Sequence, residues 1–169
     1  CQYSAEQGQA TDWHLIHLGQ LALSGAGLLF IEATAVSPEG RITTHDLGLW
    51  SDQTETALAK VIKSVRHHST MPIAIQLAHA GRKASTQVPW AGGQSIAPPQ
   101  GGWQTFAPSA LPFNQDDTLP RALDDAALQR IRHDFVAAAQ RAVHLGIAAI
   151  ELHVAPGYLL HEFLSPLSN

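Results

Sequence analysis

Two side chains that can handle protons lie close together near the end of the chain. His153 and Tyr158 are separated only by the tetrapeptide Val-Ala-Pro-Gly. An imidazole can donate a hydrogen bond to a substrate oxygen, and a phenol can release a proton when a carbanion develops beside it. The pair is therefore a candidate for acid–base chemistry. A structural or solvated role for both residues is the alternative that the spacing leaves open.

A polar side chain also interrupts an apolar run. Gln76 lies within residues 72–77, which are otherwise apolar. A carboxamide offers a donor and an acceptor together, which suits the edge of a heterocycle. The alternative is a core glutamine that bonds to the backbone. His79 follows the run, and for it a structural role is favoured over a ligand-binding role.

The ten histidines call for a test of metal binding. His14 and His17 are three residues apart, and His67 and His68 are adjacent, but the His-Glu-x-x-His pattern does not occur. The sequence therefore predicts no metal site, and a metal-dependent hydrolase is the least favoured class. Cys1 has no neighbouring base in the sequence, and no nucleophile elbow is present.

Composition excludes several classes of protein. The 169 residues carry a formal net charge of −4, and 45% of them are apolar, which argues against disorder and against nucleic acid as the main partner. The single cysteine excludes an internal disulfide. No apolar run approaches the roughly 18 residues of a membrane span. We expect a cytoplasmic protein with no membrane contact.

Helical and strand patterns alternate along the chain. The expected order is helix, strand, helix, strand, long loop, helix and strand, over residues 12–24, 28–31, 52–68, 72–77, 83–120, 125–145 and 148–153, with a loop from Val154 onward. Asp12, Ser51 and Asp124 are the expected N-terminal caps. Six of the ten prolines fall in the long loop, while its tryptophans, Trp90 and Trp103, favour an ordered path for it.

This alternation predicts βαβ units and a parallel sheet. Polar residues follow each expected strand, so the site should lie at the carboxyl ends of the strands. A (β/α)₈ barrel needs eight strands and about 250 residues. The chain shows three strands and begins with Cys1, so we expect residues 1–169 to be a single partial domain from a longer protein.

Several segments together resemble the Old Yellow Enzyme family of flavin-dependent ene reductases, and its bacterial class related to YqjM and xenobiotic reductase A in particular. The two most specific segments are the one around Gln76 and residues 157–169. The matching segments are Cys1–Ser4, Asp12–His14, Glu32–Val36, Gly40–Ile42, Leu49–Asp52, Ile75–Ala84, Ala107–Ala110, Glu151–His153 and Gly157–Asn169.

The resemblance implies part of an FMN-binding TIM barrel, roughly strands 2–4, that uses NADPH or NADH to reduce the C=C bond of an enone-type substrate. By that resemblance, Tyr158 donates a proton and His153 binds the substrate carbonyl. Tyr3 would contact the substrate. The residues implied to face FMN are Cys1, Ala33 and Gln76.

Two departures from the family pattern stand out. Pro156 occupies a position where the family has a second donor, and proline lacks both a donor side chain and an N–H. Loss of one such donor costs about 10²–10³ in rate. The later strands are also missing, so we expect open strand edges, two uncovered sheet faces and an impaired or inactive fragment. A homo-oligomer stays open for the complete protein, as does a catalytically silent fragment that binds flavin or phenols.

Overall fold

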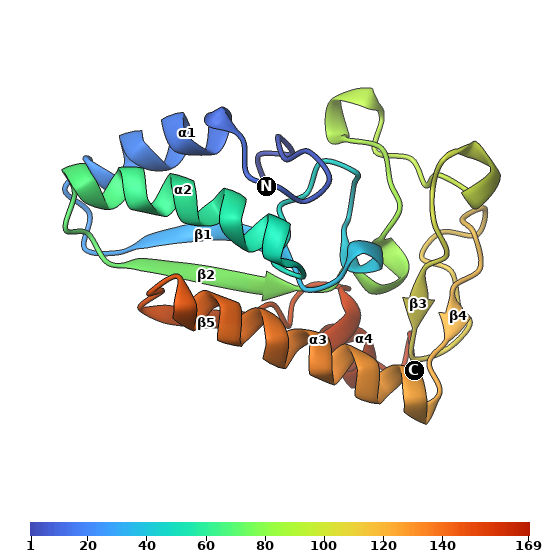
Figure 1. The fold of residues 1–169 in the computed structure, drawn as a ribbon. Coiled ribbons are helices and arrows are strands. Elements are labelled where there is room, and N and C mark those ends of the chain that lie inside the picture. Colours follow the sequence, from blue (N-terminus) through green and yellow to red (C-terminus); the bar gives the residue numbers. More distant parts are fainter.

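Three parallel strands form the centre of the computed structural model, which describes residues 1–169. Their order in the sheet is β1-β2-β5, with β1 at Leu29–Ala35, β2 at Ile73–Ala78 and β5 at Ala149–Leu152. Helix α2 (Asp52–His68) connects the first two strands, and helix α3 (Asp125–His144) precedes the third (Figure 1). The predicted βαβ order and parallel sheet are confirmed.

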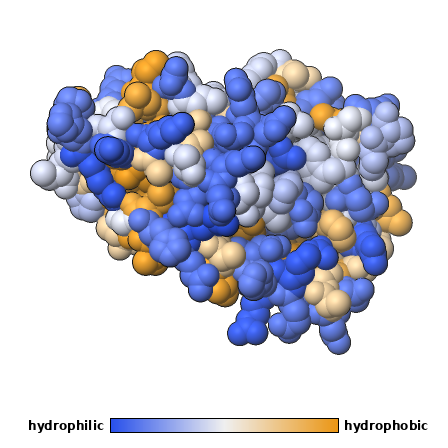
Figure 2. All heavy atoms as spheres, in the orientation of Figure 1, coloured by the Kyte–Doolittle hydropathy of each residue, from blue (hydrophilic) through white to orange (hydrophobic).

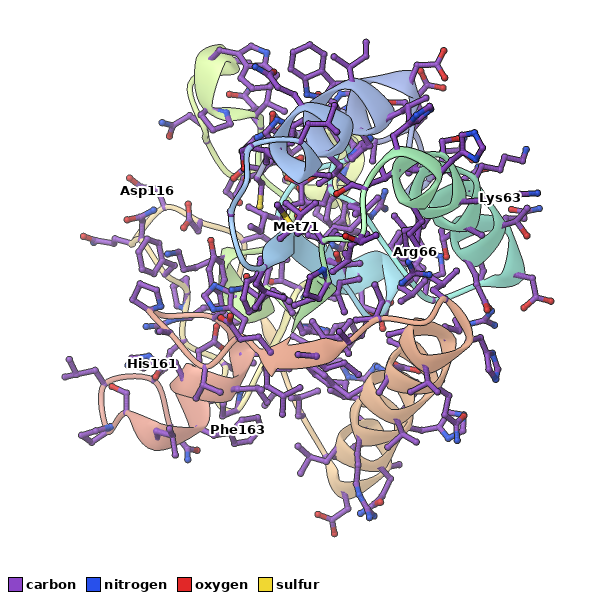
Figure 3. All side chains as sticks on the ribbon, turned by 90° about the vertical axis from the view of Figure 1, so that its left-hand side faces the viewer. Lys63, Arg66, Met71, Asp116, His161 and Phe163 are labelled. Atoms are coloured by element: carbon purple, nitrogen blue, oxygen red, sulfur yellow. The ribbon has the colours of Figure 1, made fainter.

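The core lies between one face of this sheet and the helices. Apolar side chains of β1 and β2 pack against α2, α3 and helix α1 (Asp12–Ala22), which surround the sheet on its outer side (Figure 3). The strand residues of the core are Leu29, Ile31, Ile73, Ile75 and Leu77. From α2 and α3 the core includes Leu58, Val61, Ile62, Val65, Ala138 and Ala142.

The other face of the sheet is bare. Phe30 is 46% exposed, and all four residues of β5 are exposed. The outer edges of β1 and β5 have no neighbouring strand, so the barrel does not close. The expected open edges are present. Helices α1, α2 and α3 cover one face over β1 and β2. At β5 both faces are exposed as expected, because Ile150 and Leu152 lie in register with the core residues Ile75 and Leu77 and are still 38% and 53% exposed. Apolar side chains also reach the surface over α1 (Figure 2).

Side-chain caps begin the helices. Ser51 Oγ accepts from the Thr54 N–H, and the Asp124 carboxylate accepts from the Ala127 N–H, as predicted for both caps. The prediction that Asp12 caps α1 is wrong by one residue. The cap is Thr11, which has an extended backbone. Its N–H donates to Nδ1 of His14 at 3.0 Å.

The long segment between β2 and α3 is ordered by side chains from elsewhere. The Arg41 guanidinium lies over the rings of Trp50 and Trp103, and the Trp103 indole N–H donates to the Glu39 carbonyl at 2.9 Å. This segment contains two short strands that pair in parallel, β3 at Phe106–Ala107 and β4 at Arg121–Ala122. Trp103 anchors the path, whereas Trp90 is 72% exposed.

A short helix corrects the expected loop after Val154. Helix α4 covers Leu159–Leu164, and the buried Leu159 donates its N–H to the His79 carbonyl at 3.0 Å. Six residues are too few to show a helical period, so the sequence pattern could not reveal it. No helix of the protein combines the length and the apolar character needed to cross a membrane.

Candidate functional site

The strand register brings the predicted polar residues together at the carboxyl ends of the strands. Ala33 pairs with Gln76, which in turn pairs with Glu151, so the three share the bare face of the sheet. A register shift between Ile31 and Ala33 places Ala33 beside Gln76. We call the row formed by Ala33, Gln76 and Glu151 the polar row. The Gln76 amide donates to a Glu151 carboxylate oxygen at 2.7 Å. The alternative of a glutamine bonded to the backbone is therefore wrong.

His153 and Tyr158 meet at the same edge. Their ring centroids are 4.8 Å apart, with the ring planes tilted by 53°. The His153 N–H donates to the Leu77 carbonyl at 2.9 Å, which extends the ladder between β2 and β5 and fixes this backbone. Gly157 has a φ of +85° and donates its N–H to His161 at 3.1 Å, so the chain turns there and brings Tyr158 back over the sheet.

Small side chains surround this pair. A hollow at the strand ends is lined mainly by alanines and one glycine, together with His153 and Tyr158; the small residues are Ala33, Ala35, Gly40, Ala78 and Ala80. A Cβ added at Gly40 would lie 2.8 Å from the ring of His79, so no larger residue fits there. The side chains that line the hollow beside the polar row are therefore mostly small.

Burial shifts the pKa values of Tyr158, Tyr3 and His153 toward their neutral forms. It raises the pKa of Tyr158, and the negative charge of Asp46 raises that pKa further. The pKa of Tyr3 is raised by the same two causes in the same order. Burial lowers the pKa of His153; Glu151 opposes that shift, and Lys83 adds to it. The site thus presents neutral hydrogen-bond donors, which suits transfer of a proton or polarisation of a carbonyl.

A buried carboxylate holds the loop that lies next to the hollow. Asp46 accepts hydrogen bonds from the N–H groups of Ile42 at 2.6 Å and Thr43 at 3.0 Å, and from the Thr43 hydroxyl at 2.8 Å. Burial raises the pKa of Asp46, although these hydrogen bonds oppose the shift. Asp46 was not predicted from the sequence, because a single Asp in a loop carries no pattern.

The N-terminal segment is attached to the middle of β1, at Glu32. Glu32 accepts from the Gln2 N–H and lies 3.2 Å from the His14 imidazole, and the Cys1 amine is 4.0 Å from the same carboxylate. Cys1 is exposed, and Tyr3 lies edge-on to the indole of Trp90, with the ring centroids 6.1 Å apart. The attachment places the first residues near the polar row.

A second, larger cavity adjoins the hollow. It has a volume of about 400 Å³ and is lined by Tyr3, Ile42, Arg82, Lys83 and Phe113, among others. Ile42 lines the hollow as well, so the two spaces are neighbours. Lys83 was not predicted from the sequence. Its signal was its place in the turn that follows β2, at the end of the run Gly81-Arg-Lys83.

Comparison with known proteins decides the family. The model of the NADH:flavin oxidoreductase / NADH oxidase family matches residues 1–169. The chain belongs to this family. An NADH:flavin oxidoreductase of Gibberella zeae is 47% identical to it over 173 residues, which cover 100% of the chain and 42% of the relative. An NADPH dehydrogenase of Bacillus subtilis is 40% identical over 171 residues, with 100% of the chain and 46% of the relative covered.

Solved structures of this flavin oxidoreductase family share the fold. Morphinone reductase superposes with a TM-score of 0.79 at 30% identity, over 99% of the chain and 46% of that protein. An Old Yellow Enzyme from a Pichia species superposes with a TM-score of 0.83 at 26% identity, over 99% of the chain and 43% of that protein. The resemblance to Old Yellow Enzymes and the partial barrel fold are both confirmed.

The chain spans less than half the length of the curated family members it matches. Its three strands are therefore a part of the barrel, and their bare face corresponds to the barrel interior. The residues at the strand ends fit a flavin, because the Gln76 amide offers a donor and an acceptor and its register partner on β1 is the small Ala33. The family description names a flavin and NADH, in agreement with the expected FMN and nicotinamide cofactors.

Proposed function

We propose that this chain forms the substrate-facing part of an FMN-dependent NAD(P)H oxidoreductase that reduces the C=C bond of α,β-unsaturated carbonyl compounds. The observation that supports this proposal best is the placement of the His153 and Tyr158 rings, 4.8 Å apart at the edge of the polar row. Both favour their neutral forms near pH 7: the pKa of Tyr158 is raised by burial from an ordinary value of 10.0, and burial lowers the pKa of His153 from 6.5.

Three residues of the chain would hold the flavin. The Gln76 amide can bond to the polar edge of the ring system, and Ala33, its partner in the register, leaves room beside it. Cys1 would lie next to the ring, since its amine lies near Glu32, the residue before Ala33 in β1. When bound, FMN supplies the hydride, and NADPH or NADH reduces it again.

His153 and Tyr158 would have different roles in the reaction. His153 donates a hydrogen bond to the substrate carbonyl, which stabilises the negative charge that develops on that oxygen. Tyr158 then gives its phenolic proton to the α-carbon. Tyr3, which lines the adjoining cavity, would contact the rest of the substrate. The single unpaired cysteine supports a reducing, cytoplasmic location as part of this proposal.

A catalytically silent flavin- or phenol-binding protein is the second candidate, and Pro156 is the observation that favours it. The position that carries a donor in the resembled family presents only a carbonyl here, which accepts from Lys83 at 3.4 Å. With one donor fewer, a ligand can still bind, while its reduction is slow. The two candidates differ in turnover, not in binding.

The deciding experiment compares Tyr158→Phe with the unchanged FMN-loaded holoenzyme. Reduction of the flavin by NADPH should stay within about twofold, whereas turnover of cyclohex-2-enone should fall by about 10²–10⁴, the usual contribution of a general acid. Lys63→Gln, an exposed position on α2 on the side of the molecule opposite His161 of α4, is the matched control (Figure 3). Absence of enone turnover in the unchanged holoenzyme would favour the silent candidate.

A further inference from the structure

Lys83 brings a positive charge next to the candidate proton donor. Its Nζ lies 4.8 Å from the ring centroid of Tyr158 and 4.8 Å from that of Phe113, and it donates to the Pro156 carbonyl at 3.4 Å. Gly157 packs against the same side chain, because a Cβ added there would lie 3.4 Å from Lys83 Cδ. Two aromatic faces and one carbonyl therefore hold the ammonium in place.

No carboxylate forms an ion pair with this ammonium, although its charge acts on the pKa of the buried Glu162 and Asp117 lines the same cavity. None of the ion pairs of the protein includes Lys83, and the acidic Glu151 and Asp46 bond instead to Gln76 and to the Ile42–Thr43 backbone. An ammonium has three N–H donors, and the Pro156 carbonyl uses one of them. Lys83 thus has donors and charge available for a ligand.

The larger of the two neighbouring spaces gives that ligand its room, because the hollow beside Tyr158 has a volume of only about 10 Å³. Lys83 lines the cavity of about 400 Å³, and its Nζ lies over the ring of Tyr158, which lines the hollow at the strand ends. Ile42 lines both spaces. A conjugated ligand seated beside Tyr158 would therefore bring its oxygen within reach of Lys83 and extend into the cavity.

We propose that Lys83 binds the anionic oxygen of a conjugated ligand seated beside Tyr158, and so supplies the positive charge that Pro156 cannot. The inference rests on the proposed function and names the ligand class of the same site. The ligands are phenolates and carbonyl compounds whose oxygen becomes negative during reduction. An ammonium takes over the role of a second neutral donor, because a charged donor bonds an anionic oxygen more strongly.

The test measures binding of 4-nitrophenolate and of neutral 4-nitroanisole to the FMN-loaded holoenzyme by titration calorimetry, at mildly alkaline pH and low salt. Lys83→Gln should weaken 4-nitrophenolate binding by about ten- to a hundredfold, the range expected for one hydrogen bond to a charged group. It should change 4-nitroanisole binding by less than about twofold. Lys83→Arg should retain most of the phenolate affinity, and Lys63→Gln all of it.

Equal weakening of both probes by Lys83→Gln would overturn the inference, because it would show a structural role instead of a role for the charge. Unchanged phenolate binding would overturn it as well. The proposed function fails separately. A holoenzyme that turns over no enone yet binds phenolate through Lys83 would refute the reaction and retain the anion site. Enone turnover that depends on Tyr158, without any effect of Lys83 on phenolate binding, would do the reverse.

Discussion

Gly81, in the turn after β2, is in direct contact with Glu162 of α4, although the two residues are 81 positions apart in the sequence. A Cβ added at Gly81 would lie only 2.2 Å from a carboxylate oxygen of Glu162, and the same oxygen accepts from the Arg82 N–H at 3.0 Å. Glu162 is fully buried, and its second oxygen has no partner. This contact fixes α4, and with it Tyr158, against the turn that follows β2.

Gly81→Ala should lower the free energy of unfolding of the holoenzyme by roughly 2–4 kcal/mol, because the new methyl group displaces a buried carboxylate and the φ of +62° disfavours any side chain. Urea denaturation measures the loss. Gly19→Ala is the matched control, since Gly19 lies in α1 with open space around it. It should stabilise by about 0.5–1 kcal/mol. Equal effects of the two substitutions would contradict the prediction.

Glu162 should make stability depend on pH. Burial raises its pKa to about 7 from an ordinary value of 4.5, and the Arg82 N–H only partly opposes the shift. Between these values the folded protein holds more protons than the unfolded chain, so stability falls as pH rises from about 4.5 to about 7. Glu162→Gln should flatten that slope in unfolding curves measured across the window.

Comparing the unchanged protein with Glu162→Gln also separates the contribution of Glu162 to the pH dependence of stability from that of His79. Burial lowers the pKa of His79 from 6.5 to about 4, so His79 makes stability rise with pH over that interval. Both proteins contain His79, and its contribution therefore cancels in the difference between their curves. A slope that is the same with Glu162 and with glutamine would show that this carboxyl does not titrate in the window.

Pro156→His should restore the missing donor. Because one such donor contributes about 10²–10³ in rate, kcat/KM for cyclohex-2-enone should rise by up to that factor in the holoenzyme, together with affinity for phenolic ligands. Pro156→Ala is the control: it removes the ring and adds no donor. Unchanged turnover and affinity in Pro156→His, or an equal gain in Pro156→Ala, would show that the proline does not limit the site.

The isolated chain should be unstable or associate with itself. Phe30 is 46% exposed on the bare face, and Leu152 is 53% exposed on β5. No strand pairs with the outer edge of β5, and the outer edge of β1 pairs only at Ala35, which bonds to Leu47 and Leu49. Such edges promote association between chains. Light scattering during a thermal scan should show concentration-dependent aggregation, and an FMN titration should show weak binding or none. A cooperative unfolding transition of a monomer would contradict this expectation.

Local residue patterns predicted most of the elements correctly. The stripe along α2 and the caps Ser51 and Asp124 depend only on neighbours within a turn or two, so they are readable from one stretch of chain. Helix α4 escaped prediction, because its six residues are held by contacts with the turn after β2 and not by their own period. The cap of α1 was misplaced by one residue for a related reason, since a histidine side chain completes it.

For the candidate site, too, some features can be predicted from the sequence and others depend on the tertiary structure. The sequence by itself determined which chemistry-bearing residues exist and that they follow the strands, because polar residues after apolar runs mark the carboxyl ends of a parallel sheet. Only the tertiary structure decided that Gln76 bonds to Glu151, that Asp46 holds the adjoining loop, and that Lys83 lies over Tyr158. These relations depend on strand register and on contacts between distant segments, and neither leaves a periodic signal in the sequence.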